Sequence, residues 1–339
     1  MKICMLGQAH TRPAQGWNTP VNDTREWLRV LGGGDVLNYQ QVLAKPAMLN
    51  GYDLVIVELT PKTHRLPRFI KKHHPDLFCV GLVEGRVEYV VRSSDDMEGL
   101  FEFCTVVDDL DLLGVLVERT VPYYRLYVSR PERVAWLGVP YPKDWTDRLA
   151  FPTPQQRKPV IELGSAMDSR NGITNLLILR ELQKRFPRVN GRVFAFHPRE
   201  PEMIKALGIK AEILRPRSWP DYFRVHASAF AVLCMDDRRT WGRYVLDSAS
   251  ARLPYVGTNL SHCGEQDAVL QCDPFDTELA LDYLSELLER YFKEDHSRYE
   301  EVCAQQYLAL NKYTPAASRE RFLNAVLAAA YTGPQPEPT

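Results

Sequence analysis

The stretch at residues 232–266 holds the residue types of this chain that are best suited to chemistry. An apolar run ends at Cys234 or Met235, a polar loop follows, and a helix is expected to begin near Gly242 with Thr240 as its N-cap. Backbone N–H groups and the dipole at a helix start favour a phosphate. Positive charge around this helix start comes from Arg238, Arg239 and Arg243. The pattern predicts an anion site, although a solvated helix start with surface arginines would look the same.

Asp247 follows Gly242 by about one and a half helical turns. At that spacing its carboxylate could reach the hydroxyls of a ribose whose phosphate lies at the helix start. Asp236 and Asp237 resemble a metal-binding pair, but the nearby arginines compensate their charge. The adjacent His73 and His74 would point to different faces of a helix. We therefore expect no metal site.

The glycines do not form either of the common nucleotide-binding motifs. Gly7 and Gly16 are too far apart for a GxGxxG fingerprint, and the glycines at 32–34 follow a helix instead of opening one. The sequence also contains no GxxxxGK[ST]. Binding of NAD and a P-loop are therefore not expected.

Apolar runs alternate with amphipathic stretches along most of the chain. Such alternation is typical of parallel sheets with helices on both faces. The segments expected as strands are residues 2–7, 36–39, 52–58, 77–83, 105–107, 133–137, 160–164, 191–196, 213–215, 229–234 and 255–257. Those expected as helices are residues 24–31, 66–73, 98–104, 110–116, 173–185, 202–207, 218–225, 242–251, 277–292, 299–310 and 316–331. The pattern predicts an α/β protein of two Rossmann-like halves in tandem, closed by C-terminal helices.

A stretch rich in proline and tryptophan, residues 138–159, interrupts the alternation and is expected to link the two halves. We expect an N-terminal Rossmann-like domain over residues 1–150 and a C-terminal one over 151–312. A helix within 313–332 is expected to cross back to the first domain. The proline-rich tail 333–339 is expected to be disordered.

The composition is that of an ordinary globular protein. The chain has 339 residues, 45% hydrophobic and 25% charged, with a net charge of −1, unlike a protein that wraps nucleic acid non-specifically. No apolar run approaches the roughly 20 residues of a membrane-spanning helix, and the N-terminus does not resemble a signal peptide. The seven cysteines never form CxxC, so a reducing, cytoplasmic location is expected.

Three segments together resemble the GT-B fold glycosyltransferases, the nucleotide-sugar enzymes of the glycogen synthase and mannosyltransferase type. The family's donor-binding segment runs E-G-x-G-(four)-E-A-(five)-P-V-V, and the positions that occupy or neighbour it here are Gly242, Asp247, Ala249 and Pro254. Residues 160–182 are similar to the segment that opens the family's C-terminal domain, with Gly164, Asn171 and Gly172 on the pattern. Residues 133–145 resemble the end of its N-terminal domain. The resemblance implies two Rossmann-like domains that face each other across a cleft.

The sequence departs from this pattern where the family binds the donor diphosphate. The family's first glutamate falls on Arg239, and its usual basic pair falls on Ser165 and Asn171, with Arg170 next door. A reorganised clamp of Arg170, Arg239 and Arg243 would explain these changes, because guanidinium groups bind diphosphate oxygens in pairs. A decayed site would explain them as well.

The resemblance also implies further site residues. A polar residue at a strand end in the N-terminal domain faces the transferred sugar, which makes Glu84 the candidate general base or sugar-orienting group, unless it only pairs with Arg86. His10, in the first loop, is a candidate contact to acceptor or donor phosphate, or is simply solvated. His197 and Arg199 follow a strand where the nucleobase pocket usually lies.

The implied function is transfer of a sugar from a nucleoside diphosphate sugar, a UDP-sugar more than a GDP-sugar, to a hydroxyl acceptor. Retention of configuration and independence of metal and cofactor are implied too. The acceptor is left open between a glycan, a lipid-linked sugar, a small molecule and a hydroxymethylated base in DNA. The basic helix expected at 66–73 permits an anionic acceptor. Two alternatives remain: a catalytically silent protein that binds a nucleotide or a partner, and a sugar-nucleotide epimerase.

Overall fold

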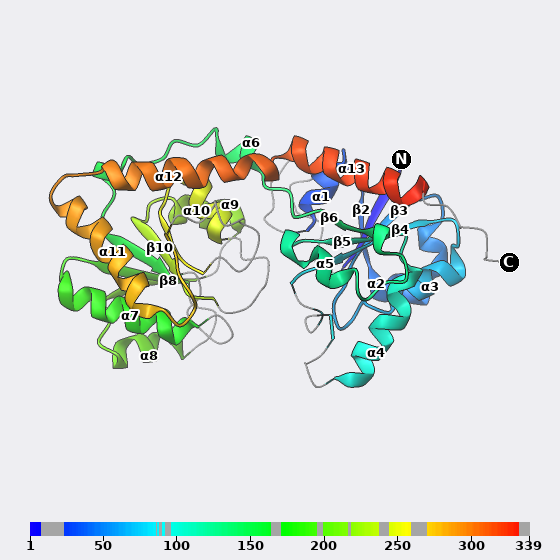
Figure 1. The fold of residues 1–339 in the computed structure, drawn as a ribbon, viewed down its shortest axis with the longest axis horizontal. Helices are drawn as coiled ribbons and strands as arrows, with labels where there is room; N and C mark the ends of the chain where they lie inside the picture. Colours follow the sequence, from blue (N-terminus) through cyan, green and yellow to red (C-terminus); the bar gives the residue numbers. More distant parts are fainter. Residues whose placement is uncertain are drawn as a thin grey trace. The chain divides into compact units, whose positions relative to one another are not determined.

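The computed structural model describes residues 1–7, 24–85, 87, 90–91, 96–163, 171–194, 199–215, 218–236, 244–258 and 270–331. The chain divides into two compact units (Figure 1). Unit 1 comprises Met1–Pro142 and Tyr313–Thr339, and unit 2 comprises Lys143–Lys312. Each unit is built around one parallel sheet of six strands.

The sheet of unit 1 has the strand order β2-β1-β3-β4-β5-β6, with every neighbouring pair parallel. This is the flavodoxin-like order with one more strand at the edge. Its strands are β1 (Ile3–Gly7), β2 (Asp35–Asn38), β3 (Leu54–Glu58), β4 (Phe78–Val83), β5 (Leu112–Val115) and β6 (Val134–Trp136). The α-helices of the unit are α1 (Glu26–Val30), α2 (Tyr39–Ala44), α3 (Leu66–His73), α4 (Met97–Val106), α5 (Val121–Tyr124) and α13 (Pro315–Tyr331).

The C-terminal helix α13 is part of the core of unit 1. Phe322 is fully buried, and its ring centroid lies 5.0 Å from that of Trp27 on α1. Arg321 Nε donates to the carbonyl of Leu137 at 2.8 Å, and its guanidinium lies 3.9 Å from the centre of the Trp136 ring. Burial lowers the pKa of Arg321 to about 10. These contacts fix α13 beside β5 and β6 although the whole of unit 2 separates them in the sequence.

The sheet of unit 2 has the order β12-β11-β10-β7-β8-β9, again with all neighbours parallel. Read from β9, this is the Rossmann order 3-2-1-4-5-6. The strands are β7 (Val160–Leu163), β8 (Asn190–Phe194), β9 (Ala211–Leu214), β10 (Ala231–Cys234), β11 (Tyr255–Gly257) and β12 (Leu270–Gln271). The helices are α6 (Lys143–Thr146), α7 (Gly172–Arg185), α8 (Glu200–Ala206), α9 (Trp219–His226), α10 (Tyr244–Ser250), α11 (Thr277–Phe292) and α12 (Ser297–Ala309).

The two faces of the second sheet differ in chemistry. Ile161 and Leu163 of β7 belong to an apolar core that includes Leu179 of α7 and Leu284 of α11, two helices that lie side by side (Figure 1). Glu162, between them in the strand, points to the other face, because side chains alternate along a strand. It is fully buried there, among residues of α9.

A buried arginine joins the helices on that second face. Arg157 is 2% exposed, and its guanidinium donates to the carbonyls of Ala227, Ala229 and Ala251. Ala227 follows the last residue of α9, and Ala251 follows the last residue of α10. The positive charge therefore lies where the dipoles of two helices end, which favours it.

Two parallel sheets in an α/β chain confirm the predicted fold class. Two of the predicted elements are wrong. Residues 110–116, expected as a helix, contain strand β5, and residues 105–107, expected as a strand, contain the end of α4 and the start of a 3-10 turn, Val107–Asp109. The strand β5 is buried along its whole length. A strand buried on both faces has a continuous apolar run, and periodicity alone cannot separate such a run from a helix.

Candidate functional site

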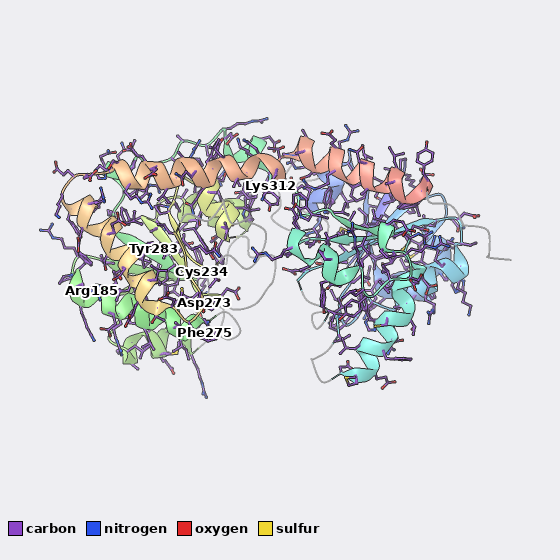
Figure 2. The ribbon with its side chains drawn as sticks, viewed as in Figure 1. Arg185, Cys234, Asp273, Phe275, Tyr283 and Lys312 are labelled. Carbon is purple, nitrogen blue, oxygen red and sulfur yellow. The ribbon has the colours of Figure 1, made fainter. Side chains whose placement is uncertain are left out.

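The topology of unit 2 selects one edge of its sheet for ligand binding. In an open parallel sheet, ligands bind beyond the carboxyl ends of the strands where the strand order reverses. Here the order reverses between β7 and β10, which are neighbours in the sheet and lead to α7 and α10. Cys234 and Asp273, labelled in Figure 2, lie where β10 and β12 end at this edge.

A buried amide fixes the two sides of this reversal point to each other. Asn175, at the end of the first turn of α7, is fully buried. Its Oδ1 accepts a hydrogen bond from the backbone N–H of Met235 at 2.9 Å, directly after β10. The start of α7 and the end of β10 therefore hold a fixed relative position.

The chain after β10 is also tied to the end of β11. Thr258 donates its backbone N–H to the carbonyl of Cys234 at 3.0 Å, and its hydroxyl donates to the carbonyl of Asp236. Gly257 makes this approach possible: its φ is +146°, and a Cβ there would lie 2.0 Å from the Cys234 carbonyl oxygen. The backbone leading into the predicted anion site is therefore fixed up to Asp236.

Asp247 lies on α10 and is 2% exposed. Its Oδ1 accepts a hydrogen bond from Trp219 Nε1 at 3.2 Å. Trp219 is the first residue of α9, and its ring centroid lies 5.2 Å from that of Trp145 and 5.3 Å from that of Phe223. The carboxylate is thus held by an indole whose own position is fixed by ring packing.

A cluster of buried charged residues lies next to these aromatic residues, where His226 contacts Phe223. Glu162 Oε1 is 2.6 Å from His226 Nδ1, and Arg192 forms an ion pair with the same glutamate at 3.6 Å. Tyr222, whose hydroxyl is 3.4 Å from Glu162, packs on Phe194 at the end of β8. The cluster anchors α9 to β7 and β8 through charged hydrogen bonds, which are stronger than neutral ones.

Four of the predicted site residues lie in the described part of the chain. Asn171 is the N-cap of α7, in the left-handed conformation at φ 52°, and its side chain does not cap the helix. Arg199 is the N-cap of α8, after β8. Together with Asp247, these residues lie at connections on the carboxyl edge of the second sheet. Glu84 is exposed and directly follows β4 in the other unit.

The other predicted residues lie outside the described ranges, and their placement stays a prediction: His10, Ser165, Arg170, His197, Arg239, Thr240, Gly242 and Arg243. Two residues that matter at this edge were missed by the sequence reasoning, Asn175 and Trp219. An amide on the apolar face of the helix expected at 173–185 was the available signal for Asn175. No pattern in the sequence marks Trp219 as a partner of Asp247.

The basic helix α3 has acidic partners within its own unit. Arg65 pairs with Glu102 at 2.6 Å, and Arg68 pairs with Asp109 at 2.9 Å. Lys71 pairs with Asp111 at 2.6 Å. These ion pairs offset part of the positive charge of the helix, and the choice of acceptor stays a prediction.

The described residues contain no group of three or more histidine, cysteine, aspartate or glutamate side chains arranged to hold a metal ion. Within the same part of the chain, no helix has both the length and the apolar character needed to span a membrane.

No protein-family model matches the chain, and no curated protein matches it by sequence. Solved structures do match. Anabaena HepE in complex with UDP and glucose is 12% identical, with a TM-score of 0.73 over 97% of this chain and 100% of that one. Trehalose-6-phosphate synthase OtsA is 9% identical, with a TM-score of 0.72 over 96% and 99%.

S. aureus TarM, solved with UDP among its ligands, is 10% identical with a TM-score of 0.64 over 80% of this chain. The chain spans about half the length of TarM, 55%. These matches confirm at the level of the fold what the sequence motifs predict: the chain has the GT-B fold of glycosyltransferases.

Proposed function

We propose that the chain is a glycosyltransferase that moves a sugar from a nucleoside diphosphate sugar, a UDP-sugar first among them, to a hydroxyl acceptor. One observation carries the proposal. Over 97% of its length, the chain shares its fold with a protein solved in complex with UDP and glucose. The strand order of its second sheet reverses between β7 and β10, and parallel sheets bind nucleotides at such a reversal point.

The donor is proposed to bind to unit 2, at the carboxyl edge of its sheet. Asn175 and Gly257 support this site, because each fixes the backbone beside the reversal point. Helix α7 begins at the same point. The first N–H groups of a helix of this length favour a phosphate. Arg170, Arg239 and Arg243, in the connections after β7 and β10, are proposed to complete the diphosphate clamp.

The chemistry follows from where charge develops. As the bond between sugar and diphosphate breaks, negative charge grows on the departing diphosphate, and preorganised N–H groups and guanidinium groups stabilise it. Such a clamp stabilises the departing diphosphate as a metal ion does in other enzymes, so we propose metal-independent transfer. Glu84 is proposed to orient the transferred sugar or to take the proton of the acceptor, and retention of configuration is proposed from the family resemblance.

Thermal unfolding with UDP, GDP, ADP and CMP tests donor binding. A nucleotide at 100 times its dissociation constant stabilises the folded state by about 2.7 kcal/mol. We expect Arg243→Ala to abolish the shift. Lys184→Ala should leave it unchanged, because this exposed lysine pairs with Glu181 at the opposite end of α7 from the proposed phosphate site. No shift with any nucleotide would refute the proposed donor site.

Release of UDP from a UDP-sugar then separates an enzyme from a silent nucleotide-binding protein, the alternative that Arg239 favours. For an enzyme we expect Glu84→Gln to slow turnover by about 10²-fold or more without loss of nucleotide binding. The matched control is Glu132→Gln, an exposed glutamate of the same unit just before the amino end of β6. Nucleotide binding without release of UDP, with water and with each of the acceptor classes named above, would favour the silent alternative.

A further inference from the structure

The Asp247 carboxylate lies in a place where it needs fixed hydrogen-bond donors. It is 2% exposed, in a helix whose described neighbours in sequence are mostly apolar or small. An ionised carboxylate taken out of water is costly unless donors replace the water. Trp219 Nε1 supplies one such donor at 3.2 Å.

The direction of that donor is set by packing. An indole has a single N–H and no acceptor, so its hydrogen bond to Asp247 is the only one it can donate. The Trp219 ring contacts the rings of Trp145 and Phe223 at 5.2 and 5.3 Å, and Trp219 opens α9, where Pro220 follows it. Ring packing of this kind leaves the indole little freedom to turn. The indole therefore helps to set the orientation of the carboxylate.

Both residues lie near the ligand edge of the sheet. α9 follows β9, and α10 follows β10, so both helices begin at the carboxyl edge. An aspartate is one methylene shorter than the glutamate of the glycosyltransferase pattern, so its oxygens have a shorter reach and their placement matters more.

The geometry points to Trp219 as a positioning residue that holds the Asp247 carboxylate toward the ribose of the donor nucleotide, so that preference for a ribose over a deoxyribose depends on the indole N–H. The inference rests on the proposed function and adds to it a determinant of specificity. Trp219 acts through Asp247 and does not itself need to touch the ligand.

A purely structural role for Trp219 predicts something different. Loss of the indole would then weaken the binding of every nucleotide by the same factor, because only the fraction of folded protein or the shape of the site changes. A positioning role instead changes the ratio between the affinities for UDP and its deoxy analogues. That ratio is the quantity to measure.

The experiment measures the dissociation constants of UDP, 2′-deoxy-UDP and 3′-deoxy-UDP by calorimetry. For the unmodified chain we expect at least one deoxy analogue to bind about 10- to 100-fold more weakly, the effect of one hydrogen bond to a charged group. In Trp219→Phe, which keeps an aromatic ring but has no N–H, the ratio should fall to about threefold or less. Asp247→Asn should lower the same ratio.

Tyr291→Phe is the matched control. This aromatic residue of the same unit also donates one hydrogen bond, from its hydroxyl to the carbonyl of Arg157 at 2.7 Å, and its ring packs on Phe230 and Phe292, so the ratio should stay as in the unmodified chain. If Trp219→Phe does not fold, benzothienylalanine at position 219 removes the N–H with almost no change of shape.

The outcomes separate the two proposals. If the unmodified chain binds UDP but does not discriminate against either deoxy analogue, or if the preference persists without the N–H, the inference is overturned and the proposed function stands. If the unmodified chain binds neither UDP nor GDP, ADP or CMP, the proposed function fails and this inference fails with it. If it binds one of the other nucleotides instead, the same ratio is measured with the deoxy analogues of that nucleotide.

Discussion

Replacing Gly257 by alanine tests whether the end of β10 is as tightly fixed as the geometry indicates. Gly257 ends β11 with φ at +146°, a region that L residues rarely adopt. A Cβ would lie 2.0 Å from the carbonyl oxygen of Cys234 and 2.6 Å from its carbonyl carbon. Real Cβ atoms do not approach closer than 3.0 Å, so one backbone must move by about 1 Å.

The magnitude follows from three terms. A positive φ costs a non-glycine residue about 1–2 kcal/mol. Overpacking a well-packed site costs about 1–3 kcal/mol. The shift also breaks the hydrogen bond from Thr258 N–H to the Cys234 carbonyl, now 3.0 Å long, for about 1 kcal/mol. We expect Gly257→Ala to lower the free energy of unfolding of unit 2 by about 3–6 kcal/mol.

Gly208→Ala is the matched control in the same unit. Gly208 has φ at +68°, but no atom lies within 4 Å of its added Cβ, so only the backbone term of about 1–2 kcal/mol applies. Hydrogen exchange measured by mass spectrometry reports the opening free energy of each unit separately. Peptides from β7 and α11 report on unit 2, and peptides from β3 and β4 serve as an internal reference in unit 1.

Two results would refute the reasoning. If Gly257→Ala costs no more than Gly208→Ala, the Cys234 carbonyl yields without strain and the backbone beside the proposed site is not rigid. If the peptides of unit 1 lose as much protection as those of unit 2, the strain is not confined to the sheet that contains Gly257.

Three further predictions concern buried charge and thiols. Arg157→Met should lower the free energy of unfolding by about 3 kcal/mol, because three backbone carbonyls lose their donor; urea unfolding measures it. Glu162→Gln should cost about 1.5–3 kcal/mol, since it removes the charge that His226 and Arg192 share and leaves Arg192 only the exposed Glu212, 3.1 Å away; a urea midpoint equal to that of the unmodified chain would contradict this. Of the described cysteines, Cys104 is the exposed one and should react first with a thiol reagent; because partial burial raises its pKa above the ordinary value, its rate should keep rising at a pH where an ordinary thiol is already ionised. Burial raises the pKa to about 12 for the thiols of Cys4, Cys272 and Cys303, so these should react only after unfolding, which labelling with and without urea checks.

Elements with strong local signals could be predicted from the sequence to the residue. The helix expected at 66–73 is α3, and the helix expected at 277–292 is α11. In both, apolar residues recur at helical spacing. Asp276 is the N-cap of α11, and its side chain accepts a hydrogen bond from the N–H of Leu279. Local capping and periodicity act within a few residues of each other, so one sequence suffices to read them.

The strand order and the contacts of the site could not be predicted in the same way. The bond between Asn175 and Met235 joins residues 60 apart, and the bond between Trp219 and Asp247 joins residues 28 apart. Such pairs depend on which strands become neighbours, and alternation of strands and helices does not specify that order. The sequence could locate Asp247 on a helix after a buried strand, but only the fold brings a donor to its carboxylate.

The uneven faces of the second sheet explain why its stability and its proposed function can change separately. The face packed against α7 and α11 is apolar, and burial of such surface stabilises by roughly 25 cal/mol per Å². The face under α9 contains the cluster around Glu162, where buried charges contribute little net stability but fix the position of the helix. Because α9 starts with Trp219, a helix fixed by this cluster also fixes the indole that holds Asp247. Leu179→Ala should therefore lower stability and leave the ratio of UDP to deoxy-UDP affinity unchanged. Glu162→Gln should lower stability and also change that ratio. Equal ratios in the two variants would show that the polar face does not position the carboxylate.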